Sequence, residues 1–136
     1  MSFLLDTNVV SEIRKPRPDR RVRRWFDEVP GADLYLSVLV LGEIRQGVER
    51  LRRRDADAAR ALDGWLRTLH RSFADRVLPV SAEIADRWGR LNVPDPVPTV
   101  DGLLAATALV HDLVLVTRNV ADVASIGVAV LDPFDN

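Results

Sequence analysis

Cysteine is absent from this 136-residue sequence. Its absence excludes disulfide bonds, thiolate nucleophiles and thiolate zinc sites, so any metal ion must be held by oxygen or histidine. The sequence also has no uncharged apolar stretch near the roughly 20 residues that span a bilayer. Nor does its N-terminus show the basic lead-in and apolar core of a signal peptide. We therefore expect a cytoplasmic protein with no membrane segment.

Lysine is nearly absent, since Lys15 is the single lysine among 19 basic residues. The 20 acidic residues bring the net charge to -1, which gives no overall attraction to nucleic acid. The basic residues are unevenly spread, however, and seven of them fall within residues 14–24. Arginine suits bidentate contact with phosphate. A charge run of this kind is nevertheless more often a solvated helix face.

The apolar residues, 47% of the chain, form short β-type runs separated by stretches with helical spacing. The runs cover residues 3–5, 34–37, 76–80 and 113–117, with a weaker one at 128–132. We expect the intervening helices at residues 19–26, 38–51, 55–73, 81–91 and 99–112, with caps at Asp19, Ser81 and Thr99. This alternation predicts an α/β fold with a mainly parallel sheet, in a single domain covering residues 1–136.

Polar residues stand where several of the predicted strands end. Asp6 directly follows the first run, and Glu43 lies about a turn and a half into the helix after the second. Asn119 and Asp122 follow the fourth, and Asp101 falls in the first turn of a buried-looking helix. Ligands of open parallel sheets collect at the carboxyl ends of the strands. We therefore expect these side chains to share one site.

Several carboxylates in one cleft repel one another unless a cation offsets their charge. Oxygen ligands alone favour Mg²⁺ or Mn²⁺, ions that support hydrolysis of phosphodiesters. Taken singly, Asp6 could be a turn residue and Asp101 a helix-start residue. Glu43 lies off the apolar stripe of its helix, so exposure to solvent is its default. His70 and His111 are expected to be structural.

Four segments together resemble a known family. They are LLDTNVVSE at the start, SVLVLGEIRQGVERL in the middle, DGLLAATALVHDLVLVTRNVAD near the end and the closing VAVLDPF. In this order and spacing they resemble the PIN-domain ribonucleases. They are most similar to the VapC-type toxins of VapBC toxin–antitoxin pairs, including the subgroup whose founding pair regulates bacterial trafficking. The resemblance implies a PIN-like domain, with helices on both sides of a five-stranded parallel sheet.

The resemblance also implies a set of site residues. It makes Asp6, Glu43 and Asp101 catalytic acids that hold Mg²⁺ or Mn²⁺. Thr7 and Asn8 match the polar pair that supports the first acid, and Thr117 matches the threonine ahead of a fourth acidic position. The sequence departs from the fullest pattern at that position, where it has Asn119. Asn119 can ligate a metal through its carbonyl without bringing charge, or Asp122 can take over as the fourth catalytic acid.

Members of the family cleave RNA, often a transfer or ribosomal RNA, and are silenced by a cognate antitoxin. The resemblance therefore implies RNA as substrate and a VapB-type antitoxin as partner. It further implies a homodimer, toxin–antitoxin hetero-oligomers, and promoter DNA bound only through the antitoxin. Arg14, Lys15 and Arg118 are candidates for contact with RNA phosphates. Candidates for the antitoxin groove are Trp65, Leu66, Leu69 and Phe73.

Two other functions remain open from the sequence. One is a PIN-like module that binds nucleic acid or a partner with little or no catalysis, which the uncharged Asn119 favours. The other is a Mg²⁺-binding receiver domain of signalling proteins. The receiver domain fits poorly, because it requires a lysine late in the chain and Lys15 is the only lysine here. The RNA target and the number of metal ions are not encoded in any motif.

Overall fold

The computed structural model describes residues 1–135, and its sheet has five strands in the order β3-β2-β1-β4-β5, all paired in parallel. The strands are β1 (Phe3–Leu5), β2 (Leu34–Ser37), β3 (Val77–Leu78), β4 (Val114–Val116) and β5 (Val130–Leu131). Leu4 pairs with Tyr35 on one side and with Leu115 on the other, so β1 is the central strand. The predicted parallel sheet is confirmed. The predicted single domain includes residue 136, which lies outside the described residues.

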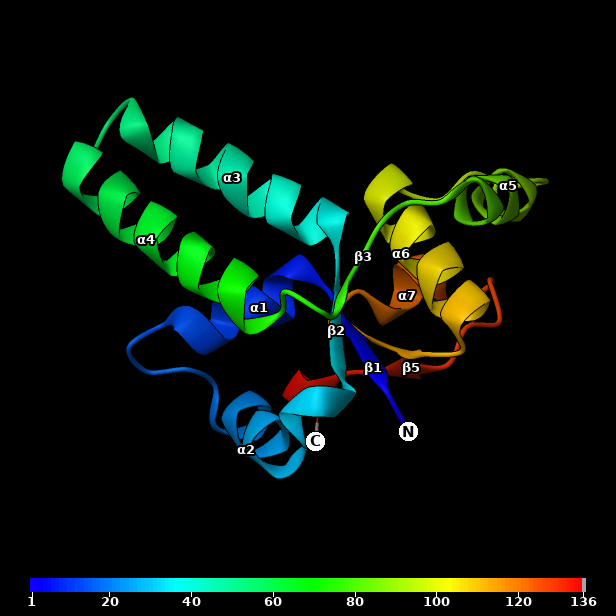
Figure 1. Ribbon diagram of the computed structural model, residues 1–136. Helices are drawn as coiled ribbons and strands as arrows, with labels where there is room; N and C mark the ends of the chain where they lie inside the picture. The colour runs from blue at the N-terminus through cyan, green and yellow to red at the C-terminus, as the bar shows by residue number, and fades with distance from the viewer. Residues whose placement is uncertain (136) are drawn as a thin grey trace.

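Helices cover both faces of this sheet (Figure 1). The helices are α1 (Thr7–Arg14), α2 (Arg20–Glu28), α3 (Val38–Arg52), α4 (Ala56–Ser72), α5 (Ala82–Leu91), α6 (Thr99–His111) and α7 (Val120–Val123). Two short 3-10 turns complete the fold, η1 (Gly31–Asp33) and η2 (Pro133–Asp135). Helices α1 to α4 lie on one side of the sheet and α5 to α7 on the other (Figure 1). Across residues 1–135, every helix is too short or too polar to cross a membrane.

Side-chain caps explain where several helices begin. Asp19 and Ser81 accept backbone hydrogen bonds at the starts of α2 and α5, as predicted. The predicted cap at Thr99 is wrong, because α6 begins at Thr99 itself, after Pro98, with no side-chain cap. Pro98 fixes its own φ, so a helix can start directly behind it. The fold also contains two helices that the sequence pattern did not predict, the short α7 and the longer α1, which Asp6 caps.

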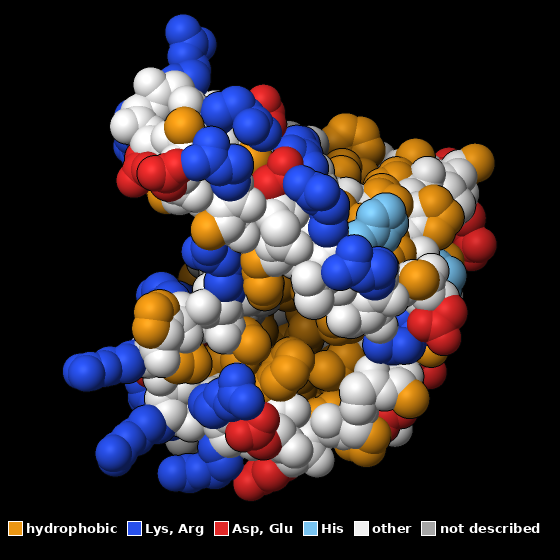
Figure 2. Space-filling model, turned by 60° about the vertical axis from the view of Figure 1, so that its left-hand side comes forward, with side chains coloured by type: hydrophobic (Ala, Val, Ile, Leu, Met, Phe, Trp, Pro, Cys, Tyr) orange, Lys and Arg blue, Asp and Glu red, His pale blue; other side chains and the backbone are white. Residues whose placement is uncertain are grey.

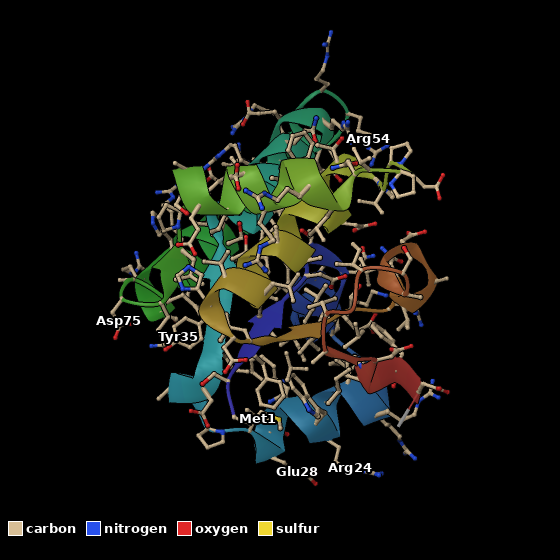
Figure 3. The ribbon with its side chains drawn as sticks, turned by 90° about the vertical axis from the view of Figure 1, so that its right-hand side faces the viewer. Met1, Arg24, Glu28, Tyr35, Arg54 and Asp75 are labelled. Atoms are coloured by element: carbon tan, nitrogen blue, oxygen red, sulfur yellow. The ribbon has the colours of Figure 1, made fainter. Side chains whose placement is uncertain are left out.

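One face of the molecule is hollowed between two arginine-rich segments (Figure 2). One segment is the α3–α4 hairpin, and the other comprises α1, α2 and the turn between them. The floor of the hollow is apolar (Figure 2). On the opposite side of the sheet, α5 lies across α6 (Figure 3). The hollowed, arginine-rich face thus lies on the side of α1 to α4, whereas Asp101 belongs to α6 on the other side of the sheet.

Candidate active site

The carboxyl ends of β1, β2 and β4 meet in the middle of the sheet, and a small acidic cavity lies there. Its volume is about 120 Å³. The residues that line it are Asp6, Thr7, Asn8, Glu43, Val100, Asp101, Leu104 and Asn119. Four of the predicted metal ligands therefore line a single cavity, although they come from widely separated parts of the chain.

Asp6 is the most buried acid of this site, with 4% of its surface exposed. It directly follows β1 and caps α1, accepting a 2.9 Å hydrogen bond from the Val9 amide. The Thr117 hydroxyl donates to its other oxygen at 2.5 Å. Burial is the largest influence on the pKa of Asp6 and raises it, and the charge of Glu43 raises it further. Hydrogen bonds from the Thr117 hydroxyl and from the Val9 and Asn8 amides lower this pKa, but only in part.

The Thr117 hydroxyl has a fixed orientation. Its oxygen accepts a 3.0 Å hydrogen bond from the Asn119 amide, so its single proton is available for Asp6. Thr117 itself is buried directly after β4. A chain of two hydrogen bonds therefore links the loop after β4 to the first acid.

Of the two residues expected to support Asp6, Asn8 does so through its backbone amide, whereas the Thr7 side chain does not. The Thr7 hydroxyl donates to Glu43 Oε1, which belongs to α3. Asn8 is exposed at the rim of the cavity. The reason is the unpredicted helix α1: after Asp6 the chain turns at once into a helix, which directs Thr7 toward α3. Thr7 thus ties α1 to the acid of the neighbouring helix.

Asp101 has the most perturbed carboxyl group of the site. It lies in the first turn of α6, and its pKa is raised to about 6. Desolvation is the largest cause, followed by a hydrogen bond with Asp122 and the negative charges of Asp122, Asp6 and Glu43. A hydrogen bond between two carboxyl groups requires a shared proton. The contact with Asp122 therefore favours the protonated form of Asp101.

Asn119 and Asp122 reach the site in different ways. Asn119 lines the acidic cavity, whereas Asp122 approaches Asp101 from the first turn of α7. Asp122 is exposed to solvent. The geometry therefore brings both residues to the site, and each remains a prediction for the fourth position.

The donor set fits a hydrated divalent cation. No three acidic or histidine side chains in residues 1–135 are grouped closely enough to enclose an ion by direct ligation. Mg²⁺ usually keeps several water ligands and needs only one or two protein carboxylates. Burial is the largest cause of the raised pKa values of Asp6 and Asp101, and the neighbouring carboxylates raise both further. A cation would relieve that repulsion.

The three basic residues predicted to contact RNA are engaged elsewhere in the protein. Lys15 forms a 2.9 Å ion pair with Glu12. The guanidinium of Arg14 lies 5.9 Å from the centre of the Trp65 ring, and that of Arg118 lies 3.8 Å from the centre of Phe134. All three are exposed. Their contact with RNA remains a prediction, and none of the three lines the acidic cavity.

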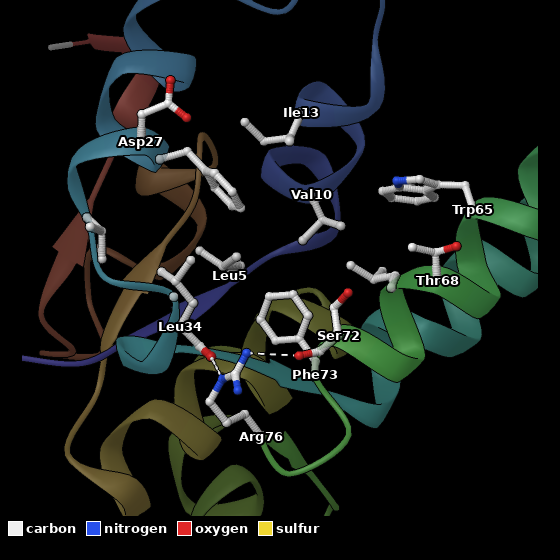
Figure 4. Close-up of a pocket in the computed structure, with 14 residues that line it drawn as sticks. Leu5, Val10, Ile13, Asp27, Leu34, Trp65, Thr68, Ser72, Phe73 and Arg76 are labelled. Carbon is white, nitrogen blue, oxygen red and sulfur yellow. Dashed lines mark hydrogen bonds between the residues drawn. The ribbon is translucent and has the colours of Figure 1, made fainter.

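A larger apolar groove lies on the same side of the sheet as α1 to α4. Its volume is about 490 Å³. Figure 4 shows Val10 and Ile13 of α1 on one side of the groove and Trp65 and Thr68 of α4 on the other, with Leu5 and Leu34 on the side away from α4 and Phe73 near the end of α4. Three of the four residues predicted for an antitoxin groove line it, namely Trp65, Leu69 and Phe73. Leu66 does not, because it faces the hydrophobic core.

Arg76 closes one end of this groove (Figure 4). Its guanidinium donates to the carbonyl of Leu34 at 3.0 Å and to the carbonyl of Ser72 at 3.0 Å. It also lies 5.0 Å from the centre of the Phe73 ring. These contacts fix the end of α4 against the start of β2. The groove is therefore a preformed feature of the fold.

Comparison with known proteins identifies the family of this chain. The PIN domain family matches residues 3–122. Toxin FitB of Neisseria gonorrhoeae is 33% identical, over 97% of this chain and 98% of the relative. VapC ribonuclease Y4jK of Sinorhizobium fredii is also 33% identical, over 98% of both chains. The crystal structure of FitAcB from Neisseria gonorrhoeae superposes with a TM-score of 0.91 at 32% identity, covering 98% of this chain and 99% of the other.

Proposed function

Because the chain belongs to the PIN-domain family, we propose that it is an endoribonuclease that acts as the toxin of a toxin–antitoxin pair. Its relatives include proteins named as a toxin and as a VapC ribonuclease. The observation that carries the proposal is the buried Asp6, held by Thr117 and facing Glu43 and Asp101 in one acidic cavity. A binding module has no need to bury this carboxylate among other negative charges.

We propose Mg²⁺ or Mn²⁺ as the cofactor. Asp6 and Asp101 would hold it, with Glu43 and Asn119 as further ligands, directly or through water. When bound, such an ion supplies an activated water molecule and neutralises charge on the phosphoryl group. The donor set contains only carboxylate and amide oxygens, which are the ligands these ions prefer.

The protein's own residues prepare this site. Thr117 and the Val9 amide orient Asp6, and Thr7 orients Glu43. Such supporting contacts fix the direction in which a ligand carboxylate points. The pKa of Asp101 is raised to about 6, mainly by burial, so below that pH its proton removes one negative charge from the site. Cleavage requires that proton to leave, so we expect activity to rise through this pH range.

Catalytic activity tests this proposal most directly. Purified wild-type protein should cleave cellular RNA with Mn²⁺ or Mg²⁺ and lose that activity with a chelator. Asp6→Asn should reduce cleavage at least about a hundredfold, because it removes the charge of the most buried acid. Asp95→Asn, an exposed acid of the loop before α6, is the matched control. Mapping the cut sites would identify the RNA, which we expect to be a transfer or ribosomal RNA.

A folded wild-type protein that binds no Mn²⁺ and cuts no RNA would contradict the proposal. It would favour the alternative function, a PIN-like binding module. The specific observation behind that alternative is Asn119, which places an uncharged side chain in the acidic cavity. Restoring the charge with Asn119→Asp would then be expected to recover metal binding.

We also propose a VapB-type antitoxin as partner. Structural neighbours include a toxin-antitoxin complex from Klebsiella pneumoniae, at 26% identity and a TM-score of 0.69, and FitAB bound to an IR36 DNA fragment, at 31% identity and 0.88. We expect a homodimer of this chain within a larger assembly that reaches promoter DNA through the antitoxin. The apolar groove that ends at Arg76 is the site we expect the antitoxin tail to fill.

The groove can be tested separately from catalysis. Trp65→Ala should weaken binding of the antitoxin encoded beside this gene about tenfold or more, because a large aromatic anchor is lost. RNA cleavage should persist, since Trp65 does not line the acidic cavity. His70→Ala, an exposed position of α4 that does not line the groove, is the control. If Trp65→Ala and His70→Ala bind the antitoxin with equal affinity, the antitoxin binds to a surface other than this groove.

A further inference from the structure

The residue after Asp101 is a buried glycine in close contact with a neighbouring segment. A Cβ atom on Gly102 would lie 2.6 Å from Val97 Cγ2. It would also lie 3.1 Å and 3.2 Å from the Cδ1 and Nε1 atoms of Trp88 on α5. The first separation is far inside van der Waals contact. Only glycine at this position allows α6 to lie this close to α5 and to the loop that joins the two helices.

The loop between α5 and α6 is held in place by Asn92. Its side-chain amide donates to the carbonyl of Trp88 at 2.9 Å, and its side-chain oxygen accepts from the Val97 amide at 3.1 Å. The Gly102 amide then donates to the carbonyl of Pro98 at 2.8 Å. Three hydrogen bonds thus connect the end of α5 to the first turn of α6, where Asp101 lies.

No hydrogen bond of the Trp88 side chain explains why its ring lies against Gly102. Its Nε1 atom is buried and has no hydrogen-bond partner among the described residues. A buried donor without a partner costs stability, so packing alone must hold the ring against Gly102. Asp101, in turn, has no hydroxyl donor comparable to Thr117 for Asp6 or Thr7 for Glu43 in residues 1–135. Its position depends on where α6 begins.

We propose that Trp88, Val97 and Gly102 form a seat that positions Asp101 for metal binding and RNA cleavage. They are positioning residues, because they act through the placement of α6 and do not line the acidic cavity. The inference rests on the proposed function. Relief of the 2.6 Å contact would require a displacement of about 1 Å. Misplacement of a reacting group by that amount can cost about a hundredfold in rate.

The seat can be tested with Gly102→Ala. Calorimetry of the folded variant should show Mn²⁺ affinity reduced about tenfold, the lower range seen when support of a metal ligand is lost. Cleavage should lose kcat, with KM for RNA nearly unchanged. A crystal structure should show Asp101 displaced relative to Asp6, a readout that does not depend on catalysis.

Two further variants separate positioning from general damage. Val97→Ala combined with Gly102→Ala removes the closest clashing atom and should recover most of the Mn²⁺ affinity. Gly89→Ala is the matched control, because it lies on the same helix as Trp88 and a Cβ there meets no atom within 4 Å. It should behave as wild type.

Asn92→Ala provides the test if Gly102→Ala does not fold. This substitution adds no atoms and removes the two hydrogen bonds that the Asn92 side chain makes with Trp88 and Val97. The Mn²⁺ affinity should therefore fall about threefold or more. Wild-type Mn²⁺ affinity in a folded Gly102→Ala variant, with Asp101 unmoved, would overturn the seat while leaving the proposed function intact. Failure of the wild-type protein to bind Mn²⁺ or cut RNA would instead overturn the proposed function and the seat's role with it.

Discussion

The acidic cavity and the α3–α4 hairpin both contain carboxylates, but their surroundings are opposite. On the hairpin, Asp63 lies 2.9 Å from Arg45, 3.5 Å from Arg67 and 3.7 Å from Arg52. The hydrogen bond from Arg45 is the main reason that the pKa of Asp63 is lowered. In the cavity, burial and neighbouring acids raise the pKa values of Asp6 and Asp101.

The difference separates structural from functional carboxylates. Arginines beside Asp63 neutralise its charge within the chain itself, so the hairpin needs nothing from outside. The cavity has hydroxyl and amide donors but no arginine or lysine among its lining residues. Its remaining charge requires an external positive partner, such as a divalent cation. Substitutions at the two places should therefore affect different measurements.

Among residues that support a carboxylate without being one, the largest effect is expected at Thr117, which holds Asp6. Thr117→Val keeps the shape of the side chain but removes the donor to Asp6, so RNA cleavage should fall about tenfold to a hundredfold. The pKa of Asp6 should rise further, because a hydrogen bond that lowers it is lost. Single-turnover cleavage is the measurement, and Thr117→Ser is the control that keeps the hydroxyl. A valine variant that cuts RNA at the wild-type rate would show that Asp6 needs no such support.

A smaller effect is expected on stability in the absence of metal. The pKa of Asp101 is about 6 in the folded protein, above its ordinary value of 3.8. The folded protein therefore binds the proton more tightly, and this contribution to stability is present below about pH 4 and lost as pH rises through 6. Asp101→Asn cannot ionise and should be more stable than wild type at pH 8 by about 1 kcal/mol after allowance for solvent screening.

Thermal unfolding in a chelator at pH 4 and pH 8 measures this difference. The two proteins should unfold at similar temperatures at pH 4 and diverge at pH 8. The same variant should lose RNA cleavage, so stability and activity would move in opposite directions. A variant that is less stable than wild type at pH 8 would mean that the charge on Asp101 is already offset within the chain.

The smallest effect is expected on the hairpin. Asp63→Asn should lower Tm by a few degrees at most, because ion pairs with solvent-exposed arginines contribute little. High salt should shrink the difference, since it screens the same charges. RNA cleavage should be unchanged. A large loss of cleavage would connect the hairpin to the active site and remove the distinction between the two regions.

Parts of the site could be read from the sequence because they depend on neighbours along the chain. Asp6 follows an apolar run, Asp101 falls early in an apolar helix, and both are therefore near the ends of secondary-structure elements. Glu43 also follows a predicted strand, but its helical position off the apolar stripe favoured solvent exposure, and only the resemblance to PIN domains implied a catalytic role for it. The helix α1 was missed, although Asp6 at its start and Val9, Val10 and Ile13 on one face carried a signal for it.

The pairings within the site were beyond the sequence. Thr7 contacts Glu43, 36 residues away, and Thr117 contacts Asp6, 111 residues away. Spacing along the chain does not encode such contacts, because they depend on how α1, α3 and β4 pack around β1. The approach of Gly102 to Val97 and Trp88 is of the same kind.

The sequence by itself determined the alternation of strands and helices, two of the caps, and the acids that lie near strand ends. These are local properties, set by the periodicity of apolar side chains and by backbone hydrogen bonds near helix starts. The tertiary structure decided which carboxylates meet arginines and which meet only one another. Charge compensation depends on distance in space. Asp63 lies beside arginines and is a structural carboxylate of the hairpin, whereas Asp6 lies in a cavity lined by other acids and is a candidate catalytic residue.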